Sequence, residues 1–312
     1  MMMVRVIQKQ LISQRVCLLT LAREDSLPLP TWQPGAHIDV FLPDGMIRQY
    51  SLCGSLNAAT YSIAVQLEPA GKGGSRYIHD SLACGASIGI SEPRNHFPLT
   101  DSDTPCVFMA AGIGITPFIP MMEQCLRHNR SFTLYYAIAH QQDNLLSDVY
   151  RDIENVHVHN KAVEGERLNI SQILHDTPQN SDIFVCGPAG FISDVLETAA
   201  QKGISADRLH REYFSAAPID HTSDGSFEIE IASTGQIVKV AKHESMLEAL
   251  EDNGFFVPVS CEEGVCGTCI TPLLNGEADH RDVFLTDEEK AQMNKIAVCC
   301  SRAKSPRLLI DL

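Results

Sequence analysis

The residues best suited to chemistry in this chain are cysteines near its C-terminal end. Five of its 11 cysteines fall between residues 261 and 300, while the other six are scattered singly. Three of the five form a C-x4-C-x2-C motif, CEEGVCGTC, and the next pair, Cys299 and Cys300, follows about 30 residues later. Thiolates are soft ligands that bind iron, zinc and copper. This grouping therefore predicts a sulfur-ligated metal centre.

The spacing of Cys261, Cys266 and Cys269, with a fourth cysteine further on, is that of plant-type [2Fe–2S] clusters. Gly264 and Gly267 leave the backbone free to wrap such a cluster. A structural zinc site is the alternative, but zinc sites usually combine two C-x2-C pairs and this segment has one. A chance group of thiols is the other alternative. Adjacent residues of a strand point to opposite faces, so at most one of Cys299 and Cys300 is expected to face the metal.

Three further motifs are candidates for binding phosphate or a flat ring. RQYSL (48–52) combines an arginine, which can hold a phosphate, with a tyrosine, which can pack on a ring. Gly73-Gly74-Ser75 opens a helical stretch whose backbone amides suit an anion. AGIGITP (111–117) follows an apolar strand and precedes a helix, as a dinucleotide-phosphate loop does, although it is not a G-x-G-x-x-G fingerprint. Each motif alone also fits a plain strand or turn.

The elements that must position these motifs change in character along the chain. Residues 1–100 read as short alternating strands separated by turns, with one helix near 76–82, and predict an antiparallel β-barrel. Residues 101–214 alternate apolar strands with helices, near 118–126, 145–153 and 191–201, and predict a doubly wound α/β domain. Residues 215–226 read as a linker. Residues 227–312 predict a β-rich α+β domain that carries the cysteines. At 312 residues, the chain is long enough for these three small domains.

The charge and hydropathy of the chain exclude several classes of function. Its net charge of −15 repels phosphate backbones, so no nucleic-acid partner is expected. From residue 224 onward, 16 acidic residues face 8 basic ones, which suits a partner with a basic surface. No apolar run is long enough for a membrane helix, and MMMVRVIQKQL does not resemble a signal peptide. We therefore expect a cytoplasmic protein without a membrane partner.

The sequence around the cysteines resembles the C-terminal ferredoxin domain of phthalate-dioxygenase-type reductases. The resemblance is carried by CEEGVCGTCITPLLNGEADHRDVFLTDEEK and by VCCSRAKSPRLLIDL. It extends over the whole chain in the same order: flavin barrel, nucleotide domain, ferredoxin domain. The family segment commonly reads C-V-S-R-A, so the resemblance makes Cys299 the fourth ligand, after Cys261, Cys266 and Cys269. Cys300 then takes the valine position, as a small buried residue.

The resemblance also implies roles for residues of the first two domains. It makes Arg48 a ligand of the FMN phosphate, Tyr50 a wall of the flavin ring and Ser51 a neighbour of flavin N5. It places Thr116 beside the flavin and Phe214 over it. The full set of implied cofactor-binding residues is Arg48, Gln49, Tyr50, Ser51, Ala64, Val65, Gln66, Gly73, Gly74, Ser75, Gly112, Gly114, Thr116, Cys186, Gly187, Pro188 and Phe214.

The implied function is that of an NADH-dependent flavin iron–sulfur oxidoreductase. Electrons would pass from NADH through FMN and the [2Fe–2S] cluster to a Rieske non-haem iron oxygenase, with cofactors rather than side chains carrying the redox chemistry. The segment 136–142, YAIAHQQ, contains no Arg or Lys to bind a 2′-phosphate, which favours NADH over NADPH. It also departs from the family, where an arginine is common near Ile138. A free-standing NADH:acceptor oxidoreductase and a passive ferredoxin-type carrier remain the alternatives.

Overall fold

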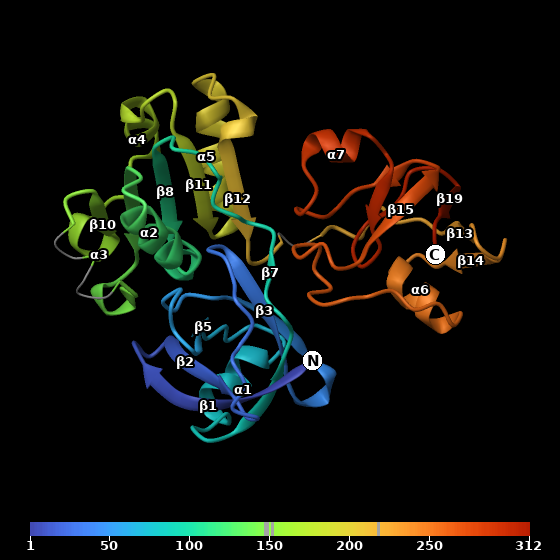
Figure 1. Ribbon diagram of the computed structural model, residues 1–312. Coiled ribbons are helices and arrows are strands. Elements are labelled where there is room, and N and C mark those ends of the chain that lie inside the picture. The colour runs from blue at the N-terminus through green and yellow to red at the C-terminus, as the bar shows by residue number, and fades with distance from the viewer. Residues whose placement is uncertain (147–149, 151–152, 217–218) are drawn as a thin grey trace. The chain divides into compact units, whose positions relative to one another are not determined.

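The computed structural model describes residues 1–146, 150, 153–216 and 219–312, which form two compact units, Met1–Glu212 and Tyr213–Leu312 (Figure 1). The helix expected near 145–153 falls largely on residues 147–149 and 151–152, which lie outside the described residues. Residues 217–218 of the expected linker also lie outside them. Within the described parts of the chain, no helix is long and apolar enough to cross a membrane.

The N-terminal half of unit 1 is the expected antiparallel barrel. Its strands follow the order β4-β3-β6-β1-β2-β5, with β7 paired to β3. A bridge between Leu52, just after β4, and Ile63 of β5 joins the two ends of this order. The bounds are β1 Met2–Leu11, β2 Val16–Arg23, β3 Ala36–Phe41, β4 Ile47–Ser51, β5 Tyr61–Gln66, α1 Gly74–Asp80, β6 Ser87–Ile90 and β7 Arg94–Asn95.

One barrel strand, β2, has no hairpin signal in the sequence before it. The turn before it has no Gly, Pro, Asn or Asp to signal a hairpin, reading Ile12-Ser13-Gln14-Arg15. The turn is made instead by backbone bonds, as the amides of Ile12 and Ser13 donate to the Val16 carbonyl at 2.9 and 3.2 Å. β2 then pairs with β1 on one side and β5 on the other, so it is central to the barrel.

The second half of unit 1 is an α/β sheet in the order β10-β9-β8-β11-β12. The first four of these strands run parallel, as the alternating pattern predicted. β8 and β11 are neighbours although β9 and β10 come between them in the chain, so the strand order reverses there. The bounds are β8 Cys106–Ala111, α2 Phe118–Arg127, β9 Phe132–Ile138, β10 Val156–Asn160, α3 Lys161–Glu164, α4 Ile170–Asp176, β11 Asp182–Gly187, α5 Ala189–Gln201 and β12 Leu209–Tyr213.

The two halves of unit 1 are bound to each other by side chains of α2. The carboxylate of Glu123 accepts hydrogen bonds from Ser55 Oγ at 2.9 Å and from the Leu56 amide at 3.1 Å. Arg127 Nη1 donates to Asn57 Oδ1 at 3.0 Å. These contacts fix the barrel against the carboxyl-terminal edge of the sheet, where the nucleotide loop lies.

Unit 2 is built on a mixed sheet in the order β14-β13-β19-β15-β17, with a small pair β16-β18. Ser245 and Glu248 form a reciprocal capping box that starts α6, and its buried face packs into the core. The bounds are β13 Phe227–Ile231, β14 Ile237–Val240, α6 Met246–Asp252, β15 Ile270–Asn275, β16 Ala278–Asp279, α7 Asp287–Ala291, β17 Lys295–Ala297, β18 Arg302–Ala303 and β19 Arg307–Ile310.

The end of the expected linker belongs to the packed structure of unit 2. Asp224 is buried and forms an ion pair with Arg281 at 2.6 Å, and Arg302 approaches it at 3.5 Å. The hydrogen bonds from Arg281, the largest cause, lower the pKa of Asp224 to about 2. Small and polar composition suggested a free connection here, but one buried charge is enough to hold the segment in place.

Candidate functional site

The cysteine site lies on two segments of unit 2. The loop between α6 and β15 carries Cys261, Cys266 and Cys269, and the turn after β17 carries Cys299. Gly267 has φ +72°, and a Cβ there would come within 2.3 Å of the Phe284 ring. A glycine is required at this point because the loop is both left-handed and closely packed. The C-G-T-C stretch is thereby held in one conformation.

The four thiols are arranged as two pairs. The sulfurs of Cys261 and Cys266 interact directly, as do those of Cys269 and Cys299. Among the described residues, no three His, Cys, Asp or Glu side chains converge as ligands of one metal ion. Two thiol pairs fit a cluster in which each of two irons needs two thiolates. Cys266 also acts on Cys269, so the two pairs lie next to each other, and it is the cysteine spacing that favours this cluster over zinc.

Donors from the loop surround these sulfurs. The amide of Glu263 lies 3.4 Å from Cys261 Sγ, and the amide of Thr268 lies 3.5 Å from Cys266 Sγ. The Thr268 hydroxyl oxygen is 3.3 Å from the same sulfur. The contact with the Cys261 side chain, the largest cause, lowers the pKa of Cys266 to about 5. Burial opposes this shift, and the contacts with Thr268 add to it. The same contact raises the pKa of Cys261, because the two thiols share one hydrogen bond.

The expectation that Cys299 and Cys300 point to opposite faces of a strand is wrong. β17 ends at Ala297, and both cysteines lie in the turn that follows, where alternation does not apply. Their thiols contact each other. Cys300 is buried and its sulfur lies against Gly264, where a Cβ would come within 2.6 Å of it. Cys300 is thus a neighbour of the cysteine site, and Cys299 is the one whose sulfur pairs with Cys269.

The RQYS motif lies on β4, where alternation divides its side chains between two faces. Arg48 lies against α1, because a Cβ on Gly74 would come within 2.9 Å of its Cγ and Nε atoms. The missing side chain of Gly74 therefore leaves room for Arg48 to lie against the start of α1, which is the predicted phosphate position. Ser75 Oγ accepts the Glu68 amide at 3.0 Å, which closes the loop before the helix.

Several other residues predicted to contact the flavin form hydrogen bonds or are partly buried within the protein. Gln49 donates to Asp39 Oδ1 at 3.0 Å. Tyr50 is partly buried against the barrel core, and burial raises its pKa. The Thr116 hydroxyl donates to the Ile113 carbonyl at 3.0 Å and holds the nucleotide loop. Phe214 belongs to unit 2 and is exposed there.

The strand β5 presents its three predicted residues differently. Ala64 and Val65 are buried, and the Val65 carbonyl lies 2.9 Å from His79 Nε2 of α1. Gln66, at the strand end, lines a pocket described below.

A buried carboxyl that the sequence did not single out lies beside Ser51. Glu212 Oε2 and Ser51 Oγ are both inaccessible to solvent and lack a well-formed hydrogen bond. Burial, the larger cause, raises the pKa of Glu212 to about 8, while its contact with Ser51 opposes this. The same carboxyl lies near Cys186, whose pKa is raised first by burial and then by Glu212. Unpaired buried polar atoms of this kind fit a site that a polar ring system completes.

The predicted nucleotide residues meet where the strand order reverses. Gly112 and Gly114 follow β8, and Cys186, Gly187 and Pro188 end or follow β11. A Cβ on Gly114 would come within 2.3 Å of the Cys186 carbonyl oxygen, so the two loops are in direct contact. Open α/β sheets bind ligands at this point, outside the carboxyl ends of the strands.

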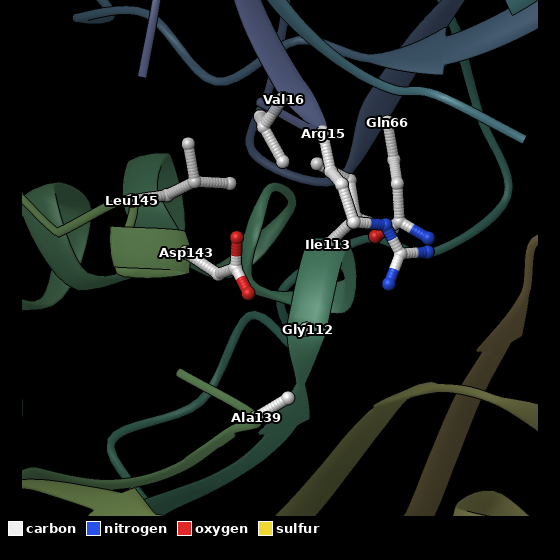
Figure 2. Close-up of a pocket in the computed structure, with 8 residues that line it drawn as sticks. All are labelled: Arg15, Val16, Gln66, Gly112, Ile113, Ala139, Asp143 and Leu145. Atoms are coloured by element: carbon white, nitrogen blue, oxygen red, sulfur yellow. The ribbon is translucent and has the colours of Figure 1, made fainter. Parts of the chain in front are cut away.

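A pocket opens beside this loop within unit 1 (Figure 2). The figure shows Arg15 and Gln66 on one side of the loop and Asp143 and Leu145 on the other. Sequence reasoning missed Arg15 and Asp143, because neither lies in a motif. Asp143 could have been noticed as an acid five residues after β9, but Arg15 had no local signal. The residues that line the pocket are Arg15, Val16, Gln66, Gly112, Ile113, Ala139, Asp143 and Leu145.

Comparison with known proteins identifies two domains and full-length relatives. Residues 229–304 match the 2Fe-2S iron-sulfur cluster binding domain, and residues 108–197 match the oxidoreductase NAD-binding domain. A vanillate O-demethylase oxidoreductase of Pseudomonas sp. strain HR199 is 42% identical over 309 residues, 97% of each chain. The carnitine monooxygenase reductase subunit of Escherichia coli K12 is 37% identical, over 99% of this chain and 98% of its own.

Two solved structures match the fold of this chain over nearly its whole length. Phthalate dioxygenase reductase, described as a modular structure for electron transfer from pyridine nucleotides to [2Fe-2S], matches with TM-score 0.73 and 32% identity, over 99% of this chain and 97% of its own. An intact type IV self-sufficient cytochrome P450 monooxygenase matches with TM-score 0.89 and 35% identity. This chain is covered completely but spans only 41% of that larger protein. The expected fold class, with its flavin, nucleotide and ferredoxin parts, is confirmed.

Proposed function

Since this chain belongs to the phthalate-dioxygenase-reductase family of oxygenase reductases, we propose that it passes electrons from NADH to a Rieske-type oxygenase or demethylase. FMN and a [2Fe–2S] cluster are its cofactors. The observation that carries the proposal is the coexistence, in one chain, of two thiol pairs and a nucleotide loop at the reversal of the strand order. NADH supply and a set of cysteines outside disulfides, four of which would bind the cluster, favour a cytoplasmic location.

The side chains around the flavin site hold and orient rather than react. Arg48, in the room left by Gly74, is placed to bind the FMN phosphate. Ser51 Oγ and the Glu212 carboxyl are placed to complete hydrogen bonds to the polar edge of the ring. FMN held here would supply the conversion of a two-electron hydride into single electrons. Because its pKa is raised to about 8, Glu212 holds a proton near neutral pH and can donate a hydrogen bond.

Cys186 serves packing rather than covalent chemistry. Its thiol is fully buried, and burial raises its pKa well above the ordinary value, so it stays protonated. Its carbonyl fixes the position of the Gly114 loop. On the metal side, Cys261, Cys266, Cys269 and Cys299 would hold the cluster, and the Glu263 and Thr268 amides would donate to its sulfur ligands.

The acceptor is proposed to dock beside the cysteine loop through an apolar centre with an acidic rim. Phe256 is 79% exposed and lies five residues before Cys261. Exposed acids flank it in the chain, namely Glu251, Asp252, Glu262 and Glu263. An exposed aromatic side chain surrounded by a polar, charged rim is typical of a protein interface. The expected partner therefore carries a basic surface around an apolar pocket.

Reconstitution with an oxygenase tests the proposed function. The probe is the purified oxygenase component of a vanillate O-demethylase, mixed with this protein, FMN and NADH. We expect product formation that requires both proteins and that declines as salt rises through the physiological range, since screening weakens steering. Rapid NADH oxidation by quinone or cytochrome c without transfer to any oxygenase would favour a free-standing oxidoreductase. The absence of NADH oxidation would leave only a passive carrier.

A further inference from the structure

The pocket beside the nucleotide loop contains a cation supplied by the barrel. Arg15 lies in the turn between β1 and β2, and its backbone is fixed at the end of β5. Its carbonyl accepts the Leu67 amide at 2.7 Å, and its own amide donates to Ser13 Oγ at 3.2 Å. The next residue, Val16, pairs with Gln66 in the β2–β5 ladder. The barrel therefore fixes the backbone from which this side chain reaches the pocket.

The opposite wall carries an acid, Asp143, which is also held by its backbone. The Tyr136 hydroxyl donates to the Asp143 carbonyl at 3.3 Å, and the Asp143 amide donates to the His140 carbonyl at 3.0 Å. Tyr136 is fully buried in β9, so this anchor is rigid. The carboxylate is thereby placed just beyond the end of β9, on the far side of the loop from Arg15 (Figure 2).

Neither charge is neutralised within the part of the chain that the structure describes. Asp143 Oδ1 is buried without a hydrogen-bond partner. No hydrogen bond or ion pair of the Arg15 guanidinium occurs among the described residues, and the two charges do not pair with each other. A pocket with one unpaired cation and one unpaired carboxylate suits a ligand that offers both an anion and hydroxyl donors.

A dinucleotide offers this combination. The diphosphate of a dinucleotide lies at the loop after the first strand of such sheets, here Gly112, and a ribose lies near the end of the second strand, here Ala139. We propose that Arg15 binds the diphosphate of NADH from the barrel side, while Asp143 accepts a hydrogen bond from a ribose hydroxyl. This assignment rests on the NADH-dependent function proposed above.

The position of Arg15 favours the diphosphate over a 2′-phosphate. Its neighbour Gln66 is on β5, the strand that also carries Ala64 and Val65 toward the predicted flavin site. Arg15 is therefore on the nicotinamide side of the pocket, and the carboxylate of Asp143 is on the ribose side. A 2′-phosphate would meet that carboxylate and be repelled. Residues 136–142 contain no cation for a 2′-phosphate, and Arg15 serves the diphosphate instead.

Anaerobic stopped-flow reduction of the bound flavin by NADH and by NADPH tests the assignment in the holoprotein. We expect the Kd of both nucleotides to rise on the order of 10- to 100-fold in Arg15→Ala, as for a lost charge-assisted bond. The loss should fall mainly on Kd, and Arg15→Lys should restore part of it. Reduced nicotinamide mononucleotide lacks the diphosphate and should lose less. Arg5→Ala, which removes an exposed arginine of β1, is the matched control.

Two results would overturn the assignment. An unchanged Kd for NADH in Arg15→Ala would show that the guanidinium does not contact the nucleotide. A loss confined to NADPH would assign Arg15 to the 2′-phosphate instead. Flavin content and circular dichroism establish that each variant is folded. If Arg15→Ala does not fold, the Kd of Arg15→Lys still tests the assignment. Failure of the wild type to oxidise NADH would instead contradict the proposed function.

Discussion

The cysteine site and the nucleotide pocket are built in opposite ways. Four cysteines of the first lie within one stretch of unit 2, three of them on a single loop. The pocket draws on residues from Arg15 to Leu145, on two halves of unit 1. A site held mainly by one loop depends on local conformation, whereas a site spread over 130 residues depends on how two substructures pack. Substitutions should therefore act differently at the two places.

The largest effect is expected at the local site. Cys299→Ser should destroy or severely weaken the cluster, because an alkoxide is a poorer ligand than a thiolate for iron–sulfur sites. Reduction of the flavin by NADH should survive, while electron delivery to the oxygenase should be abolished. Visible absorption and EPR spectra of the purified variant measure this. A normal cluster in Cys299→Ser, together with a lost cluster in Cys300→Val, would reverse the assignment.

A backbone clash should damage the distributed site nearly as much. In Gly114→Ala, the new methyl group would meet the Cys186 carbonyl at 2.3 Å, and backbone atoms cannot yield cheaply. We expect a loss of about 3 kcal/mol in the free energy of unfolding of unit 1, with weaker NADH binding. Thermal unfolding and nucleotide titration measure the two effects. Gly190→Ala on α5 is the control, since nothing lies within 4 Å of its Cβ position; equal behaviour of the two variants would contradict the clash.

The buried Glu212 should make the stability of unit 1 depend on pH. Its pKa is raised from 4.5 to about 8 in the fold, so the folded protein keeps a proton that the unfolded chain releases. The free energy of unfolding should therefore fall as pH rises from about 5 to 8, by several kcal/mol at most. Glu212→Gln should remove this fall. Unfolding midpoints of both proteins, measured across that range, provide the test, and parallel curves would show that Glu212 is not protonated.

The smallest effect is expected at Cys300. Its side chain is buried and contacts Cys299, so valine should fit with little loss of stability. Removal of a thiol beside a ligand sulfur should lower the reduction potential of the cluster slightly, because donors near the sulfurs stabilise the reduced state. Spectroelectrochemical titration of Cys300→Val detects the shift, with Cys125→Val, a buried cysteine of unit 1, as the control. An unshifted potential would make Cys300 only a packing residue.

Most elements could be predicted because their patterns are local. β13 and β14, around the turn at Ser233–Gly235, and the amphipathic α2 were readable from alternation and helical periodicity. β2 was not, since backbone bonds rather than turn residues make its hairpin. The turn at Cys299-Cys300 was also misassigned, because a short β17 ends two residues earlier than its apolar sequence suggests.

The sequence by itself determined the chemistry of the ligands and the order of the domains. The spacing of three cysteines on one loop reflects how closely their thiols must approach the two irons. Only the tertiary structure placed Arg15 opposite Asp143, set Ser51 beside Glu212 and brought Cys299 to Cys269. Such contacts join residues far apart in the chain, and their partners are chosen by sheet register and domain packing, which no local pattern encodes.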